Sequence, residues 1–383
     1  MMLAVLAVVS RAFAPRRFVP TMGLKTGIVG LPNVGKSTLF NALTEDVNAE
    51  AANYPFCTIE PNVGVVSVPD ERLLKLSGIH DSAKTVATSL EFVDIAGLVR
   101  GASEGEGLGN QFLGNVRECD AIVHVVRCFE DENIIHVDGS VDALRDIEVI
   151  ELELALSDLG QVERRLTKVS RDRKLADEAQ ALRKVQTVLD EGTQARFADL
   201  DDAELAAIAP LNLLTLKPAI FACNVNDDSL ATGNAMSEAV AALATERGEG
   251  SVLVSAQVES ELVSLSPDDR ADYLDALGVT LDTCGLRALV RAAYDTLGLI
   301  TYYTSGPTET RAWTIKDGWT APRAAGVIHG DFERGFIRAE TIAYADLLQS
   351  GTEKAARDKG LMRAEGKDYV VKDGDVMLFR FNV

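Results

Sequence analysis

Gly30-Leu31-Pro32-Asn33-Val34-Gly35-Lys36-Ser37 is the stretch of sequence that decides the fold. It matches the phosphate-loop pattern G-x-x-x-x-G-K-[S/T], in which backbone N–H groups surround a polyphosphate. Residues 24–29 before it are apolar and predict a buried strand, and residues 38–43 after it predict the first turns of a helix. A strand, a glycine loop and a helix N-terminus together direct N–H groups and a positive helix end at phosphate. The stretch therefore predicts a nucleotide-binding α/β domain.

The residues of this loop have separate predicted roles. Gly30 and Gly35 allow a close backbone approach that a Cβ atom would forbid. Lys36 should reach the β- and γ-phosphates and take part in catalysis, and the Ser37 hydroxyl should bind Mg²⁺. The candidate nucleotide-binding residues of the loop are Gly30, Asn33, Val34, Gly35, Lys36, Ser37 and Thr38.

Two later elements are typical of the segments that sense the γ-phosphate in switch nucleoside triphosphatases. Thr58 lies in a loop with two prolines, where a threonine can close over Mg²⁺; the alternative is that Thr58 merely enters the strand predicted at 63–68. Asp94 ends an apolar strand at 90–94 and can hold the Mg²⁺ hydration shell. Gly97 follows at the spacing Asp-x-x-Gly, so its N–H can contact the γ-phosphate, and we include it among the catalytic candidates.

The residue after Gly97 is Leu98, where Ras-like enzymes place a glutamine that orients the attacking water. Leucine has no polar group, so hydrolysis is expected to be slow or to depend on another group. His136 is one candidate, because histidine acts as a base near neutral pH, with a structural role as the alternative. Asn33 is a second, through a K⁺ ion that its carbonyl oxygen would help to hold beside the phosphates.

Two further strand ends predict the base-binding side of the site. Asn224-Val225-Asn226-Asp227 follows the strand predicted at 218–223 and has the Asn-x-x-Asp pattern of guanine-nucleotide enzymes. The lysine that usually stands second is replaced by Val225. Ser255-Ala256 follows the next strand and is typical of the loop behind the base. The candidate base-side residues are Asn224, Val225, Asp227, Ser255 and Ala256, since ligands bind at the carboxyl ends of strands in open α/β sheets.

The chain outside these motifs divides into three predicted parts. Between about 140 and 210, leucines recur at helical spacing, with Leu152 and Leu156 in the stripe of the first helix, and then at seven-residue spacing. This predicts two long helices: a coiled-coil hairpin, or ordinary helices packed on the domain. Residues 271–297 predict one helix. From 299 to 383, short β runs and glycine turns predict a small α+β module. We therefore assign 1–22 to targeting, 23–298 to the nucleotide-binding domain and 299–383 to the C-terminal domain.

Composition limits the partners. The net charge of −20 disfavours general nucleic-acid binding, so any RNA contact must be local. The five cysteines contain no C-x-x-C pair, and no apolar run is long enough for a membrane span, so no membrane partner is expected. Residues 1–20 are basic, lack acids and contain an Ala-Phe-Ala-Pro junction. They predict plastid targeting, with a mitochondrial presequence, or a cytoplasmic protein starting at Met22, as alternatives.

Taken together, these stretches resemble the YchF/Obg-like ATPase family of phosphate-loop enzymes, from about Met22 to Val383. The matching segments are 30–41, 53–61, 94–109, 133–137, 311–314, 326–338 and 367–383. The resemblance is greatest to the bacterial branch. It implies a nucleotide domain with a coiled-coil insertion and a C-terminal TGS domain of ubiquitin-like β-grasp shape. It also implies ribosome association and a preference for ATP over GTP.

One residue departs from the family. The family usually has Asn-x-x-Glu where this chain has Asp227, and the shorter acid is the one that pairs with guanine, so a GTP preference stays open. The predicted function is Mg²⁺-dependent hydrolysis of the β–γ phosphoanhydride, acting with the ribosome or RNA in translation. The rival is a nucleotide-gated scaffold in which turnover is incidental. A kinase is disfavoured because no acceptor motif is visible.

Overall fold

The computed structural model describes residues 24–50, 62–95, 108–280 and 285–382. The predicted targeting segment, Thr58, Gly97 and Leu98 lie outside these residues, so the predictions that rest on them are not addressed by the fold.

A six-stranded sheet forms the core of the nucleotide-binding domain, with the order β2-β4-β1-β5-β6-β7. Within this sheet β2 runs antiparallel to its neighbour, and the other pairs are parallel. Its strands are β1 (Lys25–Val29), β2 (Val63–Ser67), β4 (Ser89–Asp94), β5 (Ala121–Arg127), β6 (Ala219–Asn224) and β7 (Gly250–Val254). The predicted strands are confirmed, and the carboxyl ends of the parallel strands meet at one edge, where the predicted nucleotide elements lie.

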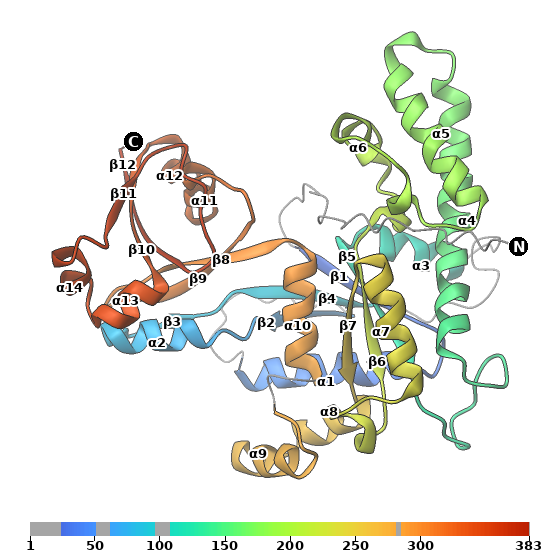
Figure 1. The fold of residues 1–383 in the computed structure, drawn as a ribbon, viewed down its shortest axis with the longest axis horizontal. Coiled ribbons are helices and arrows are strands. Elements are labelled where there is room, and N and C mark those ends of the chain that lie inside the picture. Colours follow the sequence, from blue (N-terminus) through green and yellow to red (C-terminus); the bar gives the residue numbers. More distant parts are fainter. Residues whose placement is uncertain (1–23, 51–61, 96–107, 281–284, 383) are drawn as a thin grey trace, which may run out of the picture.

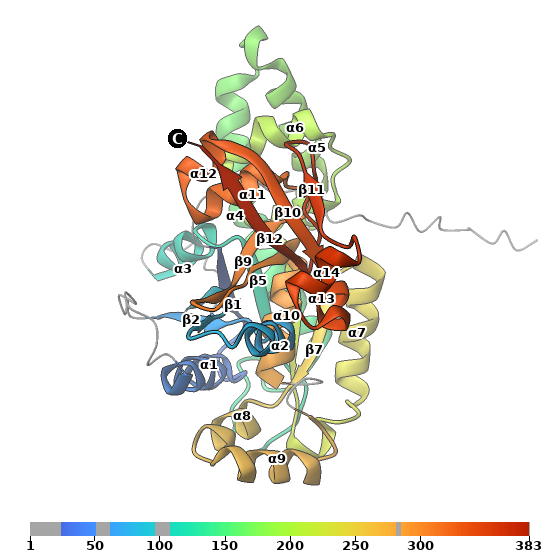
Figure 2. The ribbon, with the colours of Figure 1, turned by 90° about the vertical axis from the view of Figure 1, so that its left-hand side faces the viewer.

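Helices cover both faces of this sheet, with α1 and α7 on opposite sides (Figure 2). The helices are α1 (Lys36–Glu50), α3 (Leu108–Arg117), α7 (Ala235–Arg247), α8 (Ala256–Val263), α9 (Pro267–Ala276) and α10 (Gly285–Thr296). The single helix predicted at 271–297 is wrong, because α9 and α10 are separate. Gly278 has a φ of 72° and follows the end of α9, a backbone angle that glycine adopts without strain and that ends helices. No helix in the described ranges is long and apolar enough to cross a bilayer.

A helical hairpin is inserted between β5 and β6 and projects from the sheet (Figure 1). It consists of α4 (Ala143–Val169), η2 (Arg173–Leu175) and α5 (Ala176–Asp190), and the chain returns through η3 (Ala195–Phe197), α6 (Asp202–Ile208), η4 (Ala209–Leu211) and η5 (Leu214–Leu216). The hairpin has an apolar core of its own, which includes Val162, Leu182 and Leu189.

The predicted leucine stripe of the first helix is wrong in part. Leu152 and Leu156 are 48% and 42% exposed, whereas Ile150 and Leu154 are buried in the core of the central sheet. The first half of α4 packs on the sheet instead of on α5, so the sheet determines which positions face inward there. Periodicity alone cannot show which neighbour a helix packs against.

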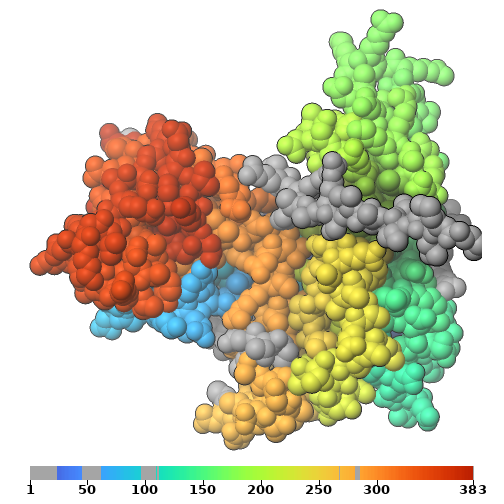
Figure 3. Space-filling view, in the orientation of Figure 1, coloured from blue at the N-terminus to red at the C-terminus, as the bar shows by residue number. Residues whose placement is uncertain are grey.

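A second six-stranded sheet has the order β11-β10-β12-β8-β9-β3. The C-terminal residues, which supply most of it, gather at one end of the molecule (Figure 3). Its strands are β8 (Leu299–Thr304), β9 (Thr310–Lys316), β10 (Phe336–Ala343), β11 (Arg363–Glu365), β12 (Asp375–Phe381) and the short β3 (Thr85–Val86). It is accompanied by α11 (Ala321–Ile328), α12 (Gly330–Arg334), α13 (Tyr344–Ser350) and α14 (Glu353–Asp358). The predicted α+β module is therefore present, with an apolar core that includes Tyr302 and Phe379.

Part of this second unit comes from the first half of the chain. The strand β3 pairs with β9, and α2 (Glu71–His80) packs beside it (Figure 1). Leu73 and Leu76 of α2 are buried in one cluster with Tyr303 and Val376 of the C-terminal sheet. The predicted boundary at 299 therefore separates the domains along the sequence but not in space.

A polar network reinforces this packing. Arg72 donates to both carboxylate oxygens of Asp70 at 3.0 Å and to Asp373 at 2.6 Å. The Tyr303 hydroxyl also donates to Asp70. Burial alone would raise the pKa of Asp70, but the hydrogen bonds from Arg72 and Tyr303 outweigh burial and hold the pKa below its usual value. The network ties the start of α2 to the C-terminal sheet.

Candidate nucleotide-binding site

The phosphate loop connects β1 to α1 at the carboxyl edge of the central sheet. Gly35 has a φ of 96°, and a Cβ atom there would lie 2.5 Å from the Asn224 side-chain nitrogen. A Cβ atom on Gly30 would lie 2.5 Å from the Val125 carbonyl oxygen. Both glycines are therefore required by contacts with the neighbouring β5 and β6 segments, as well as by the turn itself.

Asn224 is buried and joins the two sides of the site. Its side-chain amide donates to the Val34 carbonyl oxygen at 2.9 Å, and its side-chain oxygen accepts from the Ala256 N–H at 2.9 Å. The first residue of the Asn-x-x-Asp element therefore fastens the phosphate loop to the Ser255-Ala256 loop. Three elements that lie far apart in the sequence are brought together by this one side chain.

Lys36 begins α1 and is buried beneath the loop, where its ammonium group donates to the Leu31 carbonyl oxygen at 2.6 Å. Burial lowers the pKa of Lys36 to about 8, while the negative charge of Asp94 acts in the opposite direction. A lysine held inside a loop of N–H groups is arranged to meet a strongly anionic ligand, which would restore its charged form.

Ser37 and Asp94 are the described candidates for Mg²⁺. Ser37 is exposed at the start of α1, and the Asp94 Oδ1 atom is buried with no hydrogen-bond partner among the described residues. A buried carboxylate oxygen without a donor suits a hard cation or its water ligands. Within the described ranges, no group of three His, Cys, Asp or Glu side chains is arranged as a metal site. The donors fit a cation that takes its other ligands from phosphate and water.

The base side of the site is only partly formed by side chains. Val225 is 2% exposed and packs in the core between β6 and α7, so its backbone alone can face a ligand. Ser255 is also buried, and its hydroxyl accepts from the Val258 N–H to cap α8. Asp227 is exposed, and its Oδ1 atom accepts from the Asp228 N–H. An exposed carboxylate held at one oxygen can turn its other oxygen toward a base.

The loop after β5 contacts the phosphate loop. Asn33 has a φ of 62° and donates from its side-chain amide to the Ile135 carbonyl oxygen at 3.1 Å. The adjacent His136 is buried; its Nδ1 atom accepts from the Asp138 N–H at 3.1 Å, and its Nε2 atom lies 2.8 Å from Asp146. Both ring nitrogens are thus engaged, Nδ1 by the loop itself and Nε2 by Asp146 of α4. Water positioning by His136 would require this loop to rearrange, and it stays a prediction.

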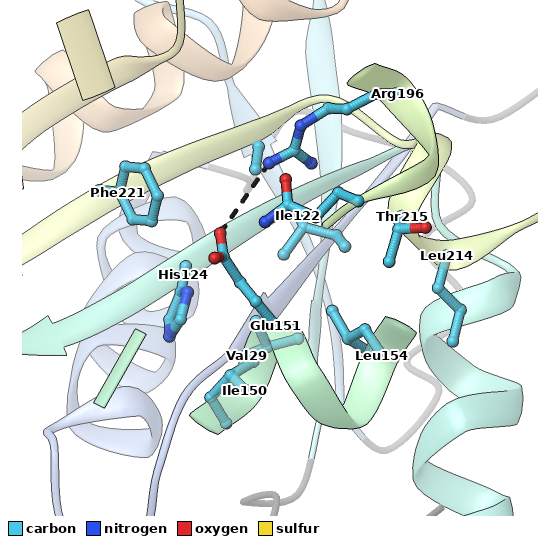
Figure 4. Close-up of a pocket in the computed structure, with 12 residues that line it drawn as sticks. Val29, Ile122, His124, Ile150, Glu151, Leu154, Arg196, Leu214, Thr215 and Phe221 are labelled. Carbon is cyan, nitrogen blue, oxygen red and sulfur yellow. Dashed lines mark ion pairs between the residues drawn. The ribbon is translucent and has the colours of Figure 1, made fainter. Parts of the chain in front are cut away.

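A small, mostly apolar cavity with a few polar side chains in its lining lies between the sheet and the base of the hairpin, and was not predicted from the sequence. It holds about 20 Å³, enough for one water molecule. Figure 4 shows the Glu151 carboxylate turned toward the Arg196 guanidinium, at 4.0 Å, with His124 nearby. Burial, followed by the charges of Lys36 and Arg247, lowers the pKa of His124 to about 3, so this histidine is neutral.

No local pattern marks these cavity residues, because they come from a strand, a helix and a return loop that meet only in the fold. Glu151 also pairs with Arg247 at 2.7 Å, and Arg196 pairs with Glu249. The ion pairs connect α4 of the hairpin with α7 and with η3. The base of the hairpin is thereby fixed to the same sheet that holds the phosphate loop.

Comparisons with known proteins place the chain in a family. Residues 25–157 match a family described as 50S ribosome-binding GTPase. Residues 299–382 match the YchF GTPase C-terminal family, described as a protein of unknown function (DUF933). The ribosome-binding ATPase YchF of Haemophilus ducreyi is 53% identical over 367 residues, covering 94% of this chain and 100% of that protein. This chain belongs to the YchF family. The ribosome-binding ATPase YchF of Bacillus subtilis is 50% identical with the same coverage.

Comparison with solved structures supports the same family assignment. The YchF GTPase of Schizosaccharomyces pombe matches with a TM-score of 0.85 and 38% identity, covering 94% of this chain and 99% of that one. A GTP-binding protein of Pyrococcus horikoshii matches with a TM-score of 0.59 at 21% identity and shares the fold. The predicted family and α/β phosphate-loop fold are confirmed, and the protein is a phosphate-loop nucleoside triphosphatase.

Proposed function

We propose that this YchF protein is a ribosome-associated, Mg²⁺-dependent hydrolase of the β–γ phosphoanhydride that prefers ATP over GTP and acts in translation. The observation that carries the proposal is the bridge made by Asn224, which aligns the phosphate loop with the base-side loop. The names of the relatives, ribosome-binding ATPase, support the ribosome as partner.

The residues divide the chemistry among them. Lys36 and the N–H groups at the start of α1 would hold the β- and γ-phosphates, and Ser37 and Asp94 would hold the cation. When bound, Mg²⁺ supplies neutralisation of the charge on the two terminal phosphates. Thr58 and Gly97 would complete the γ-phosphate contacts. The attacking water is assigned to His136 after a loop movement, or to a K⁺ ion beside Asn33; equal hydrolysis in K⁺ and Na⁺ buffers would remove the second assignment.

Base choice rests on Asp227 in this proposal. An aspartate at this place can accept two hydrogen bonds from guanine, which supports GTP as the alternative substrate. Val225 stands where guanine-nucleotide enzymes usually have a lysine, and its side chain is buried in the core. The contact that the lysine would make with a bound guanine is therefore missing. The family names support ATP, and we therefore keep ATP as the preferred substrate.

The hairpin and the C-terminal domain are proposed as the parts that meet the ribosome or RNA. The hairpin α4–α5 would act as a coiled coil, and the second sheet as a TGS domain of β-grasp type. Residues 1–22 are proposed to direct the protein to a plastid, and fluorescence microscopy of a fusion carrying these residues tests that assignment.

Single-turnover hydrolysis of ATP and GTP, with and without ribosomes, tests the function. We expect ATP hydrolysis to be faster than GTP hydrolysis and to be stimulated by ribosomes, and we expect both to be lost in Lys36→Ala. Hydrolysis that no ribosomal partner stimulates would favour the nucleotide-gated scaffold instead.

A further inference from the structure

The outer face of α4 carries a ridge of exposed leucines, at the edge of the molecule opposite the C-terminal sheet (Figure 1). Leu144, Leu152 and Leu156 are 38%, 48% and 42% exposed. Together with the exposed Glu148 they stand four residues apart, and side chains at that spacing form one continuous ridge. The ridge rises about 18 Å, at about 1.5 Å per residue. Single exposed leucines are ordinary, whereas an aligned row of them indicates a surface for a partner.

The loop that leads into α4 adds two more exposed apolar side chains. Ile135 and Val137 are 78% and 50% exposed. The loop is held against the start of α4, because the intervening His136 lies 2.8 Å from Asp146. It is also held from inside by the buried Arg127, which donates to three loop carbonyl oxygens at 3.0, 3.1 and 3.2 Å. The two apolar side chains are therefore presented on a well-supported backbone.

Acidic residues surround these apolar side chains. Residues 129–160 contain ten Asp and Glu residues, and Arg145 is the one Arg or Lys among them. Arg145 is already engaged, with Asp146 at 3.1 Å and with the Ser140 hydroxyl at 3.1 Å. Six of the acidic side chains are exposed, namely Glu130, Asp131, Glu132, Asp138, Asp142 and Glu148. The surface is thus apolar along its ridge and negative beside it.

Arginines that reach α4 from other elements leave this sign unchanged. Arg247 pairs with Glu151 at 2.7 Å, and Arg117 lies 3.8 Å from Asp158. Asp158 is buried, and Glu151 lines the cavity beneath the hairpin, so both arginines serve the inner side of the helix. The exposed acids of the outer side remain accessible to a cationic partner.

The charges restrict what can occupy this surface. Six exposed carboxylates repel RNA and anionic membranes, and a second copy of the same face would bring like charges together. A helix suits the ridge, because the ridge of one helix packs into the groove of another. We propose that the outer surface of α4 docks a basic amphipathic helix of a ribosomal protein, with apolar side chains on the leucine ridge and lysines or arginines against the acids. The inference deepens the ribosome partnership of the proposed function and rests on it.

This surface extends to the phosphate loop, so its occupant is coupled to the nucleotide site. The Asn33 side-chain amide donates to the Ile135 carbonyl oxygen at 3.1 Å. A helix that presses on Ile135 and Val137 would shift the backbone that holds Asn33 and His136, the two residues to which the attacking water is assigned. Docking thereby supplies a route by which the ribosome would stimulate hydrolysis.

Fluorescence anisotropy of a labelled peptide tests the docking directly on the full chain. The probe is a helical peptide of about 15 residues, made of leucine, lysine and alanine with the leucines on one face, which is long enough to span the ridge. One companion peptide has glutamate in place of lysine, and another has the same residues in scrambled order. We expect the lysine peptide to bind with saturation and more weakly as salt rises, and both companions to bind at least about tenfold more weakly.

Two variants locate the peptide. The double variant Leu152→Gln and Leu156→Gln changes side chains that are already exposed to residues of good helix propensity, so the fold should be retained. We expect it to weaken peptide binding at least about tenfold. Glu148→Lys should weaken binding more at low salt than at high salt. The matched control is Leu348→Gln, a leucine of α13 that is 44% exposed, which should bind the peptide as the parent protein does.

Ribosome assays on the same proteins complete the test. Ribosome cosedimentation and ribosome-stimulated ATP hydrolysis should fall in the double variant, while hydrolysis without ribosomes should stay unchanged. Peptide binding that ignores the double variant, or that ignores the sign of the peptide charge, would overturn the proposal. Self-association of the parent protein that the double variant abolishes would also overturn it, because the surface would then be a contact between copies.

The ribosome assays separate this proposal from the proposed function. If ribosomes bind and stimulate the double variant as they do the parent protein, the docking proposal fails and the proposed function stands. If ribosomes neither bind nor stimulate the parent protein, the proposed function fails and the ribosomal partner is lost with it.

Discussion

Removing the side-chain amide of Asn224 is the sharpest test of the site, because one side chain joins its two halves. Asn224→Ala deletes the hydrogen bonds to Val34 and Ala256, both 2.9 Å long. It leaves a buried carbonyl and a buried N–H without partners. An unsatisfied buried group costs about 1–3 kcal/mol, so with two such groups the variant should lose roughly 2–6 kcal/mol of unfolding free energy. The phosphate loop should also lose its alignment, and we expect nucleotide affinity to fall at least about tenfold.

The matched control is Asn226→Ala, two residues further along the same element. Asn226 is exposed, and its backbone oxygen takes part in the turn, where it accepts from the Ser229 N–H at 3.1 Å. Substitution of an exposed side chain of this kind should change stability by about 0.5 kcal/mol or less. Asn224→Asp is a second variant: it keeps the acceptor for Ala256 but turns a carboxylate toward the Val34 carbonyl oxygen.

The assays are denaturant unfolding, extrapolated linearly to water, and calorimetric titration with ATP and GTP. We expect Asn224→Ala to be the least stable and Asn226→Ala to match the parent protein, with Asn224→Asp between them. If Asn224→Ala unfolds within about 0.5 kcal/mol of Asn226→Ala and binds nucleotide equally well, the bridge carries no energy and our reasoning about the site is wrong.

Three other perturbations give distinct expectations. Lys36 has a pKa of about 8 in the folded protein, below the ordinary lysine pKa of 10.5. Between pH 8 and pH 10.5 the unfolded chain therefore binds more protons than the folded protein. The contribution of Lys36 to the free energy of unfolding consequently rises with pH in this range. ATP affinity should fall above about pH 8 by up to tenfold per unit, and Lys36→Arg should remove that slope in calorimetric titration. Asp227→Glu should shift the ATP:GTP affinity ratio toward ATP; an unchanged ratio contradicts our account of base choice. Arg72→Ala should lower unfolding free energy by about 1–2 kcal/mol through lost contacts with the C-terminal sheet, whereas the exposed Lys75→Ala should not, as denaturant unfolding would show.

Motifs were the part of the site that could be predicted from the sequence. The phosphate loop, Asp94 and the Asn224 element each lie at the carboxyl end of a strand. The parallel sheet brings these ends to one edge, so local patterns and one topological rule were enough. The bridging contacts of Asn224 required the fold, since Val34 and Ala256 lie on either side of it in the sequence.

Packing partners were the part that could not be predicted. The first half of α4 packs on the central sheet and the second half packs on α5, so the two halves bury different faces. The prediction that Leu152 and Leu156 face inward was therefore wrong. The cavity beneath the hairpin could not be predicted from the sequence either, because Glu151 and Arg196 belong to separate segments that only tertiary contacts bring together.

The interleaving of β3 and α2 with the C-terminal sheet has a practical meaning for anyone who wants to transplant that module. A graft that begins at Leu299 would leave the edge of β9 without its partner strand β3. The protein from which it was taken would keep Leu73 and Leu76, whose apolar side chains would then be exposed to water. The smallest unit that could be transplanted is therefore discontinuous and consists of residues 70–88 together with residues 299–382. Chimeras within the family should therefore exchange both segments as one cassette.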